Sequence, residues 1–406
     1  MHLLSPKGFV AGAVHAGIKS SKKNDVGLLI CDAPPLASAA AVFTTNKVFA
    51  APVKIGREHL CASGGRLRGV VVNSGNANAC TGAQGDRDAR RMCSLAAKTI
   101  SCEPKQILPC STGIIGHLMP MQKIERGIIR AAAQLGRSED HALAFADAIL
   151  TTDTRRKSAA ERVKIDRETI TIAGVCKGSG MIGPRMSLDV SPHATMLAYV
   201  TTDAEISVPL LRKLLAAATD RSFNAVTVDD HTSTNDTAVI LASGLSGATV
   251  LSARQIAAFG AALDEVCQSL AYQIAADGEG ATKVVRIEVQ GARSTSDANK
   301  IARAIANSPL VKCAMHGNDP NWGRIVSAAG LCGAEFDPDR ATLTLQGTRV
   351  FHRGRPVSFD PAKVSRALNS KEVVVDLRCN LAKSDATVWT CDLSKDYVTI
   401  NADYHT

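Results

Sequence analysis

The chain has 406 residues, of which 45% are apolar and 4% aromatic, and its formal net charge at pH 7 is +9. That length supports more than one domain or lobe, and the apolar content excludes an intrinsically disordered chain. No apolar run reaches the roughly 18 residues that span a bilayer, and proline interrupts the amino-terminal MHLLSPKGFV too early for a signal peptide. We therefore expect a globular, cytoplasmic protein with no membrane partner.

The positive charge is concentrated in the first half of the chain. Residues 1–194 hold 26 lysines and arginines against 15 acidic residues, whereas residues 195–406 hold 21 against 23, which gives net charges of +11 and −2. The basic residues are scattered and are not interleaved with aromatic residues, so the sequence predicts no nucleic-acid partner. The twelve cysteines include no CxxC pair and the ten histidines no HExxH motif, which predicts free thiols and no metal site.

Strand and helix patterns alternate along the chain and predict a mixed α/β fold. The first half is expected to contain a strand followed by an Asn- and Gly-rich loop at 67–82, helices at 84–99, 121–135 and 140–150, and a hairpin at 162–175. This hairpin should turn near Asp166 and Arg167.

The second half is expected to contain a strand at 196–200, helices starting at Ser207 and Ser252, a strand at 282–291, a helix at 296–307, and strands at 341–351, 371–378 and 385–394. Pro209 lies in the first turn after Ser207, and Gln255 would complete a capping box with Ser252. Short turns join or flank the last three strands, so we expect these strands to pair in an antiparallel manner.

Thr195 stands before an apolar run, within SPHATMLAYVTTD at 191–203. One interpretation is a strand threonine whose hydroxyl is hydrogen-bonded. The other is a nucleophile, which a threonine hydroxyl becomes only when a base lies beside it. If the bond between Ala194 and Thr195 were cut, the α-amine of Thr195 could be that base, because such an amine has a pKa of about 7.7–8.0. The small Ala194 and the glycine-rich KGSGMIGP at 177–184 permit self-cleavage.

Four other segments allow a structural or a functional interpretation. CSTGIIG at 110–116 predicts a tight turn or an oxyanion hole, in which fixed N–H groups point at one position. KGSGMIGP contains a lone GxG, which is weak evidence for phosphate binding and typical of a flexible turn. DDHTSTNDT at 229–237 predicts a loop of Asx and Ser/Thr turns. The carboxyl-terminal YVTINADYHT contains Tyr397, Val398 and Ile400, so we expect a docked tail rather than a frayed one.

Eleven segments, spread in order over most of the chain, are informative together: PKGF (6–9), VFTTNKVFAAPV (42–53), NSGNANACTG (73–82), STGIIG (111–116), TTDT (151–154), KGSGMI (177–182), ATMLAYVTTDA (194–204), TSTNDT (232–237), DGEGATK (277–283), DPNWGRI (319–325) and INADYHT (400–406). In this combination the sequence resembles the ornithine acetyltransferase family of arginine biosynthesis, also called bifunctional glutamate N-acetyltransferase.

The resemblance implies an α/β (α+β) fold, namely an N-terminal-nucleophile-like layered sandwich of two sheets between helices with a second, smaller α/β lobe. It also implies self-cleavage between Ala194 and Thr195 into an α chain, 1–194, and a β chain, 195–406. The β chain would begin with the nucleophile and dock its carboxyl-terminal tail in the site. The cleaved chains would stay associated as an α2β2 assembly, and neither a cofactor nor a metal is implied.

Carried over by position, Thr195 would be the nucleophile, and Thr112 and Gly113 would form the oxyanion hole. The residues that contact substrate would be Thr151, Lys177, Thr195, Glu279, Asn401 and Thr406. The acetyl group would pass from N-acetylornithine to Thr195 and then to glutamate in a ping-pong reaction. Some members of the family also accept acetyl-CoA as the acetyl donor.

One departure from the family pattern lies beside the scissile bond. Lys177 precedes Thr195 by eighteen residues, whereas the resemblance implies a spacing of about eleven. Two alternatives stay open: an amidase or aminopeptidase on the same fold, with water as acyl acceptor, and an uncleaved protein that only binds amino acids. Lys177, Glu279 and Asn401 favour the transferase over the hydrolase, because together they would recognise the backbone groups of an amino acid.

Overall fold

The computed structural model describes residues 1–188 and 196–403, which form two compact units. Unit 1 contains Met1–Asn224 and His231–Leu270, and unit 2 contains Ala225–Asp230 and the described chain from Ala271 onward. These units are defined by contacts, whereas a cleavage product is defined by a broken covalent bond. The division into chains 1–194 and 195–406 therefore stays a prediction.

Unit 1 contains two sheets among its described residues. Sheet A has the strand order β1 (Phe9–Val14), β2 (Val26–Cys31), β5 (Gly69–Asn76) and β6 (Ile107–Ile114). Sheet B has the order β4 (Arg66–Leu67), β3 (Ala37–Phe43), β10 (Thr237–Ala242), β9 (Leu197–Thr202), β8 (Glu168–Lys177) and β7 (Lys157–Ile165). Neighbouring strands are antiparallel except for the parallel pairs β5–β6 and β9–β10. β7 and β8 form the predicted hairpin, which turns at Asp166 and Arg167.

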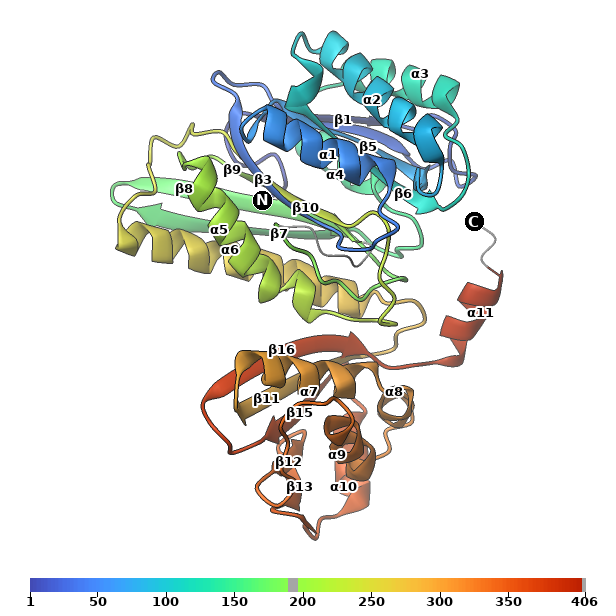
Figure 1. Ribbon diagram of the computed structural model, residues 1–406, viewed down its shortest axis with the longest axis vertical. Coiled ribbons are helices and arrows are strands. Elements are labelled where there is room, and N and C mark those ends of the chain that lie inside the picture. The colour runs from blue at the N-terminus through green and yellow to red at the C-terminus, as the bar shows by residue number, and fades with distance from the viewer. Residues whose placement is uncertain (189–195, 404–406) are drawn as a thin grey trace. The chain divides into compact units, whose positions relative to one another are not determined.

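The two sheets of unit 1 are layered between helices (Figure 1). Alternate residues of sheet A, such as Val72, share one core with Tyr199 and Val239 of sheet B. The other face of sheet A packs on α1 (Ala51–Ala62), α2 (Gly82–Thr99) and α3 (Met121–Ala132). On sheet B, α5 (Val208–Asp220) packs on β3, and α6 (Ala253–Ala276) places Leu270 over Gly174. The predicted sandwich is thus confirmed.

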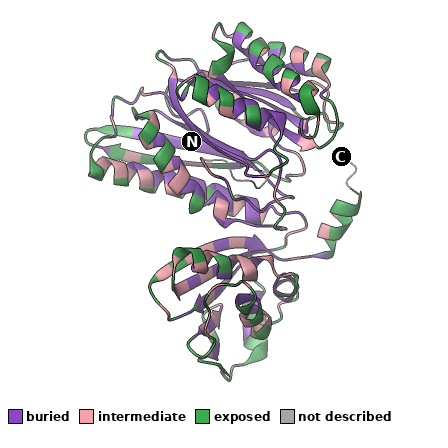
Figure 2. Ribbon diagram, viewed as in Figure 1, coloured by how far each residue is buried: buried purple, intermediate pink, exposed green. Residues whose placement is uncertain are grey.

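Burial explains why the strands of unit 1 are apolar runs. β1, β2, β3, β9 and β10 are buried along their whole lengths (Figure 2). A strand covered on both faces needs apolar residues at successive positions rather than at alternate ones. α4 (Glu139–Ala148) contributes to the same core, where the ring of Phe145 meets that of Tyr199 edge to face at 5.3 Å.

Unit 2 is the predicted smaller α/β lobe. Its sheet C has the strand order β14 (Arg355–Pro356), β13 (Thr348–His352), β12 (Thr342–Leu345), β15 (Glu372–Arg378), β11 (Val284–Ala292) and β16 (Ser384–Cys391). The helices of this unit are α7 (Thr295–Asn307), α8 (Pro309–His316), α9 (Trp322–Gly330), α10 (Pro361–Leu368) and α11 (Lys395–Asp403). Apolar residues of β11, β15 and α7 form the centre of its core.

The pairing of β15 corrects one expectation. This strand is antiparallel to β12, as predicted, but parallel to β11. Short turns fix only the direction of strands that follow each other along the chain. A long connection that contains several helices and strands separates β11 from β15, and such crossovers return the chain in its original direction.

The two predicted helix starts differ in their capping. Ser207 precedes α5 in an extended conformation, but its hydroxyl accepts no capping hydrogen bond. Ser252 forms the predicted capping box before α6. Its hydroxyl oxygen accepts from the Gln255 N–H at 3.3 Å, and the Gln255 Oε1 accepts from the Ser252 N–H at 2.8 Å.

Replacing Ser252 with alanine should therefore loosen the first turn of α6. Loss of a capping serine costs about 1 kcal/mol, so the amides of that turn should exchange faster with solvent, as hydrogen–deuterium exchange would measure. Ser94, an exposed serine inside α2, provides the control, since its replacement by alanine removes no cap. Equal exchange in α6 for the two variants would mean that the box does not stabilise the helix.

Candidate active site

Three strands of sheet B bring their ends together in one row. Lys177, the last residue of β8, pairs with Leu197, the first residue of β9, and Leu197 pairs with Thr237, the first residue of β10. The carbonyl oxygen of Met196 accepts a hydrogen bond from the Thr237 N–H at 3.0 Å. Thr195 is bonded to Met196 but, like Ala194 and Thr406, lies outside the described residues.

The predicted oxyanion residues lie at the end of β6, next to Lys177. Thr112 is buried, and its Oγ1 accepts a long hydrogen bond of 3.5 Å from the Lys177 ammonium. Gly113 has a φ of +130°, and a Cβ at this position would collide with the backbone of Gly75. Only glycine fits there. Thr112 and Lys177, from segments 65 positions apart, are thus neighbours in unit 1.

Asp153 holds this part of the site together and was not singled out from the sequence. Its carboxylate accepts hydrogen bonds from the Lys157 ammonium at 2.6 Å, the Gly178 N–H at 2.7 Å and the N–H of half-buried Thr151 at 3.1 Å. The Lys177 ammonium lies 4.0 Å away. Burial alone would raise the pKa of Asp153, but the charges of Lys177 and Lys157 outweigh burial and hold that pKa at about 2.

Asn235 links the two sheets at the same place and was also missed. Its Nδ2 donates to the Ala77 carbonyl oxygen at 2.6 Å and to the Ser111 carbonyl oxygen at 2.8 Å. One side chain therefore fixes the end of β6, just before Thr112, against the start of β10. The sequence signal was present in TSTNDT, a polar run directly before a buried strand, but it predicted only a loop of turns.

The remaining predicted substrate residues that are described belong to unit 2. The carboxylate of buried Glu279 accepts a hydrogen bond of 2.9 Å from the Asn401 side chain on α11. On the same helix, the Tyr397 hydroxyl donates to Asp229 at 3.4 Å. Burial, and after it the charge of Asp229, raises the pKa of Tyr397.

The tail is held by these polar contacts rather than by apolar packing. α11 has no buried residue, and Val398 is 64% exposed. Val398, which contributed to the expectation of a docked tail, therefore does not anchor it, and Tyr397 does so only through its hydroxyl. Asn401 contributes the second polar contact, through Glu279.

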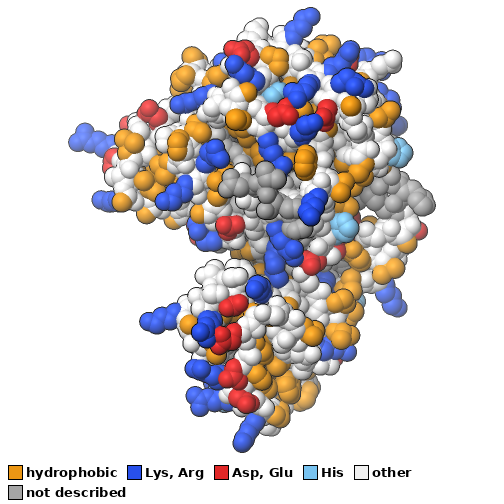
Figure 3. Space-filling model, in the orientation of Figure 1, with side chains coloured by type: hydrophobic (Ala, Val, Ile, Leu, Met, Phe, Trp, Pro, Cys, Tyr) orange, Lys and Arg blue, Asp and Glu red, His pale blue; other side chains and the backbone are white. Residues whose placement is uncertain are grey.

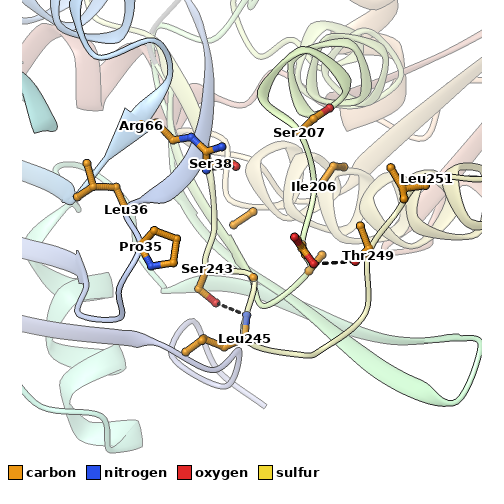
Figure 4. A pocket seen from close by; sticks show the side chains of 14 residues that line it. Pro35, Leu36, Ser38, Arg66, Ile206, Ser207, Ser243, Leu245, Thr249 and Leu251 are labelled. Atoms are coloured by element: carbon orange, nitrogen blue, oxygen red, sulfur yellow. Dashed lines mark hydrogen bonds between the residues drawn. The ribbon is translucent and has the colours of Figure 1, made fainter.

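A separate pocket lies at the opposite end of sheet B (Figure 4). This cavity of about 400 Å³ is lined by residues that follow β9 and β10, such as Ile206 and Leu245, and by Leu36 before β3. The strands run from the Lys177 row towards this pocket, so the full lengths of β9 and β10 separate the two places. Of the predicted site residues that the structure describes, none lines this pocket.

We also searched the described residues for metal-binding groups, membrane-spanning helices, disulfides and clusters of surface charge. The described residues contain no group of three His, Cys, Asp or Glu that could hold a metal ion, and none of their helices is long and apolar enough to cross a membrane. All twelve cysteines are described, and no disulfide joins any of them. On the face drawn in Figure 3, basic side chains are interspersed with acidic ones rather than gathered in a stripe.

Comparison with known proteins identifies the family. The model of the ArgJ family matches residues 10–406. The arginine biosynthesis bifunctional protein ArgJ of Symbiobacterium thermophilum is 47% identical over 406 residues, which cover 99% of this chain and 98% of the relative. The protein of the same name from Dehalococcoides mccartyi is 45% identical over 412 residues, which cover 100% and 97%.

A solved structure agrees with this match. The crystal structure of the arginine biosynthesis bifunctional protein ArgJ from Bacillus halodurans is 40% identical to this chain, with a TM-score of 0.50. The alignment covers 52% of this chain and 100% of that one. The resemblance found in the sequence is thus confirmed, and the chain belongs to the ArgJ family.

Proposed function

We propose that this protein transfers an acetyl group from N-acetylornithine to glutamate, with Thr195 as the acetyl carrier and no cofactor. The observation that carries the proposal is that Lys177 contacts Thr112 and pairs with Leu197, two residues after Thr195 in the chain. The buried Lys177 ammonium suits a substrate carboxylate. Glu279 and Asn401 suit a substrate amine, and Thr151 and Thr406 complete the proposed contacts.

The chemistry needs a hydroxyl, a base and an oxyanion site. The Thr195 hydroxyl attacks the acetyl carbonyl and its own α-amine accepts the proton, because a cleaved chain places both groups on one residue. The developing oxyanion is held by Thr112 and the Gly113 N–H. An ammonium only donates hydrogen bonds, so Lys177 leaves the hydroxyl proton of Thr112 available to the oxyanion.

The proton then returns to the leaving nitrogen, ornithine departs, and an acetyl ester of Thr195 remains. The amine of glutamate attacks this ester, which gives N-acetylglutamate and regenerates the hydroxyl. Donor and product are both amides, so the exchange needs no external energy source. Acetyl-CoA would be a second donor for the same acetyl ester.

The mechanism requires self-cleavage between Ala194 and Thr195. The B. halodurans chain is covered completely yet spans 52% of this chain, and residues 195–406 make up the same share. This agreement in length supports the cleavage. The net charges of +11 and −2 on the two pieces favour their staying together, within the α2β2 assembly that we propose for a cytoplasmic enzyme.

The purified protein should convert N-acetylornithine and glutamate into equal amounts of ornithine and N-acetylglutamate, as chromatography of the amino acids would measure. Incubation with N-acetylornithine alone is the control and should give no more than one ornithine per site. Steady release of acetate instead of N-acetylglutamate would identify an amidase. The absence of both products would leave a binding protein, and either result would contradict the transferase.

A further inference from the structure

Asp236 is a buried carboxylate that the mechanism above does not use. Its exposed fraction is 0%, and among the described residues neither of its oxygens has a hydrogen-bond partner. The Thr44 hydroxyl lies close to the carboxylate, but its hydrogen bond goes to the Ser233 carbonyl oxygen at 2.6 Å. Burial raises the pKa of Asp236 well above its usual range, although the charge of Lys177 opposes this effect.

Comparable carboxylates of unit 1 are all hydrogen-bonded. Asp203 accepts from the Thr171 N–H at 2.8 Å and the Lys7 N–H at 3.2 Å, and Asp25 accepts from four backbone N–H groups. In the described part of the chain, no other carboxylate has both oxygens buried and unbonded. A buried polar group without a hydrogen bond lowers the stability of the folded protein. The presence of such a carboxylate here therefore calls for a functional explanation.

The position of Asp236 indicates which reaction it serves. It directly precedes Thr237, whose N–H bonds the Met196 carbonyl oxygen and whose register partner is Leu197. Asp236 is therefore one residue away from Thr237, which hydrogen-bonds Met196 and belongs to the same row of strand ends as Lys177. Met196 is the residue to which Thr195 is covalently bonded. A raised pKa makes the Asp236 carboxylate a stronger base than the carboxylate of an ordinary aspartate.

We propose that Asp236 is the proton-transfer group for self-cleavage of the unbroken chain, an inference that rests on the proposed function. Before cleavage the nitrogen of Thr195 belongs to a peptide bond and cannot act as a base. The Thr195 hydroxyl therefore needs another proton acceptor, and the Asp236 carboxylate accepts this proton. Once the α-amine exists, it is the base for acetyl transfer.

The step balances as follows in atoms and protons. The Thr195 hydroxyl gives its proton to Asp236 and its oxygen bonds to the carbonyl carbon of Ala194. The carbon–nitrogen bond breaks, and Asp236 returns the proton to the nitrogen, which becomes the α-amine. Water then hydrolyses the ester between Ala194 and Thr195, which yields the carboxylate of Ala194, the free hydroxyl and one proton that the new α-amine accepts.

The test is the rate at which the full-length chain is cleaved, followed on denaturing gels. The variant Asp236→Asn keeps the shape of the side chain but cannot hold the proton, so the 42.6 kDa chain should persist and cleavage should slow at least ~100-fold. Asp203→Asn is the matched control, because Asp203 is a buried carboxylate at the other end of β9. It should be cleaved nearly as fast as the wild type.

A stability measurement separates proton transfer from a structural role. In the uncleavable Thr195→Ala background, adding Asp236→Asn removes an unpaired buried carboxylate, so the thermal midpoint should stay equal or rise. A fall of several degrees, or cleavage of Asp236→Asn at the wild-type rate, would overturn the proposal. A wild-type chain that itself remains whole would contradict the proposed function, whereas equal cleavage of wild type and Asp236→Asn would contradict only the role of Asp236.

Discussion

The variant Thr195→Ala is expected to remain a single 42.6 kDa chain and to lose acetyl transfer by at least about 10³-fold. The replacement removes the hydroxyl that attacks the acetyl group. It also prevents the cleavage that releases the α-amine, so nucleophile and base disappear together. Denaturing gels and the rate of N-acetylglutamate formation would measure the two losses on the same preparation.

Thr195→Ser is the matched control for this prediction. Serine retains a hydroxyl and, once cleaved, an α-amine, so this variant should mature and transfer acetyl groups at a reduced rate. If Thr195→Ala loses cleavage and acetyl transfer while Thr195→Ser retains both, the hydroxyl group of residue 195 is the group that reacts. A Thr195→Ala protein with normal turnover would show that another residue carries the acetyl group.

The variant Asp153→Asn should have the second largest effect, this time on stability as well as activity. Lys157 and Lys177 are 0% and 3% exposed and would lose the carboxylate that they share. Removing one partner of a buried ion pair typically costs about 3–5 kcal/mol. Acetyl transfer should fall too, because the same carboxylate positions Thr151 and the loop at Gly178.

The pH dependence of this effect has a definite sign. The pKa of Asp153 is about 2 in the folded protein against 3.8 for an ordinary aspartate. A lowered pKa stabilises the fold above the unfolded value, and this contribution is lost as pH falls through the folded value. The difference in stability between wild type and Asp153→Asn should therefore be full at neutral pH and shrink as pH falls from 3.8 towards 2.

The measurement must report on unit 1. Both tryptophans, Trp322 and Trp389, belong to unit 2, so their fluorescence would follow the other unit. The rate of hydrogen exchange at the backbone amides of β8 and β9 measures the stability of unit 1. Asp147→Asn is the control, since Asp147 pairs with Arg156 at a partly exposed site, where such pairs contribute no more than ~1 kcal/mol. An equal loss of stability in the two variants would mean that the buried Asp153 network does not stabilise unit 1 more than an exposed ion pair does.

Local patterns predicted the elements that depend on local chemistry. The hairpin at Asp166 and the capping box at Ser252 follow from turn residues and from spacing, and both are found. The hydroxyl of Ser207 makes no cap, because serine at a helix start is a preference and not a constraint. The parallel pairing of β15 required knowledge of which distant strands become neighbours.

The candidate site shows the same limit. The resemblance indicated Thr112 and Lys177, but only the fold reveals that they touch. Asp153, Asn235 and Asp236 lie in segments that contributed to the resemblance, yet their importance comes from burial and from partners far along the chain. A sequence pattern contains no direct information on either.

The mass of the protein after incubation with N-acetylornithine alone tests the central claim most directly. We predict two polypeptides, of which the one that begins at Thr195 is heavier by one acetyl group and returns to its original mass when glutamate is added. A single unbroken polypeptide that turns over normally, or an acetyl group located elsewhere on the chain, would contradict the account.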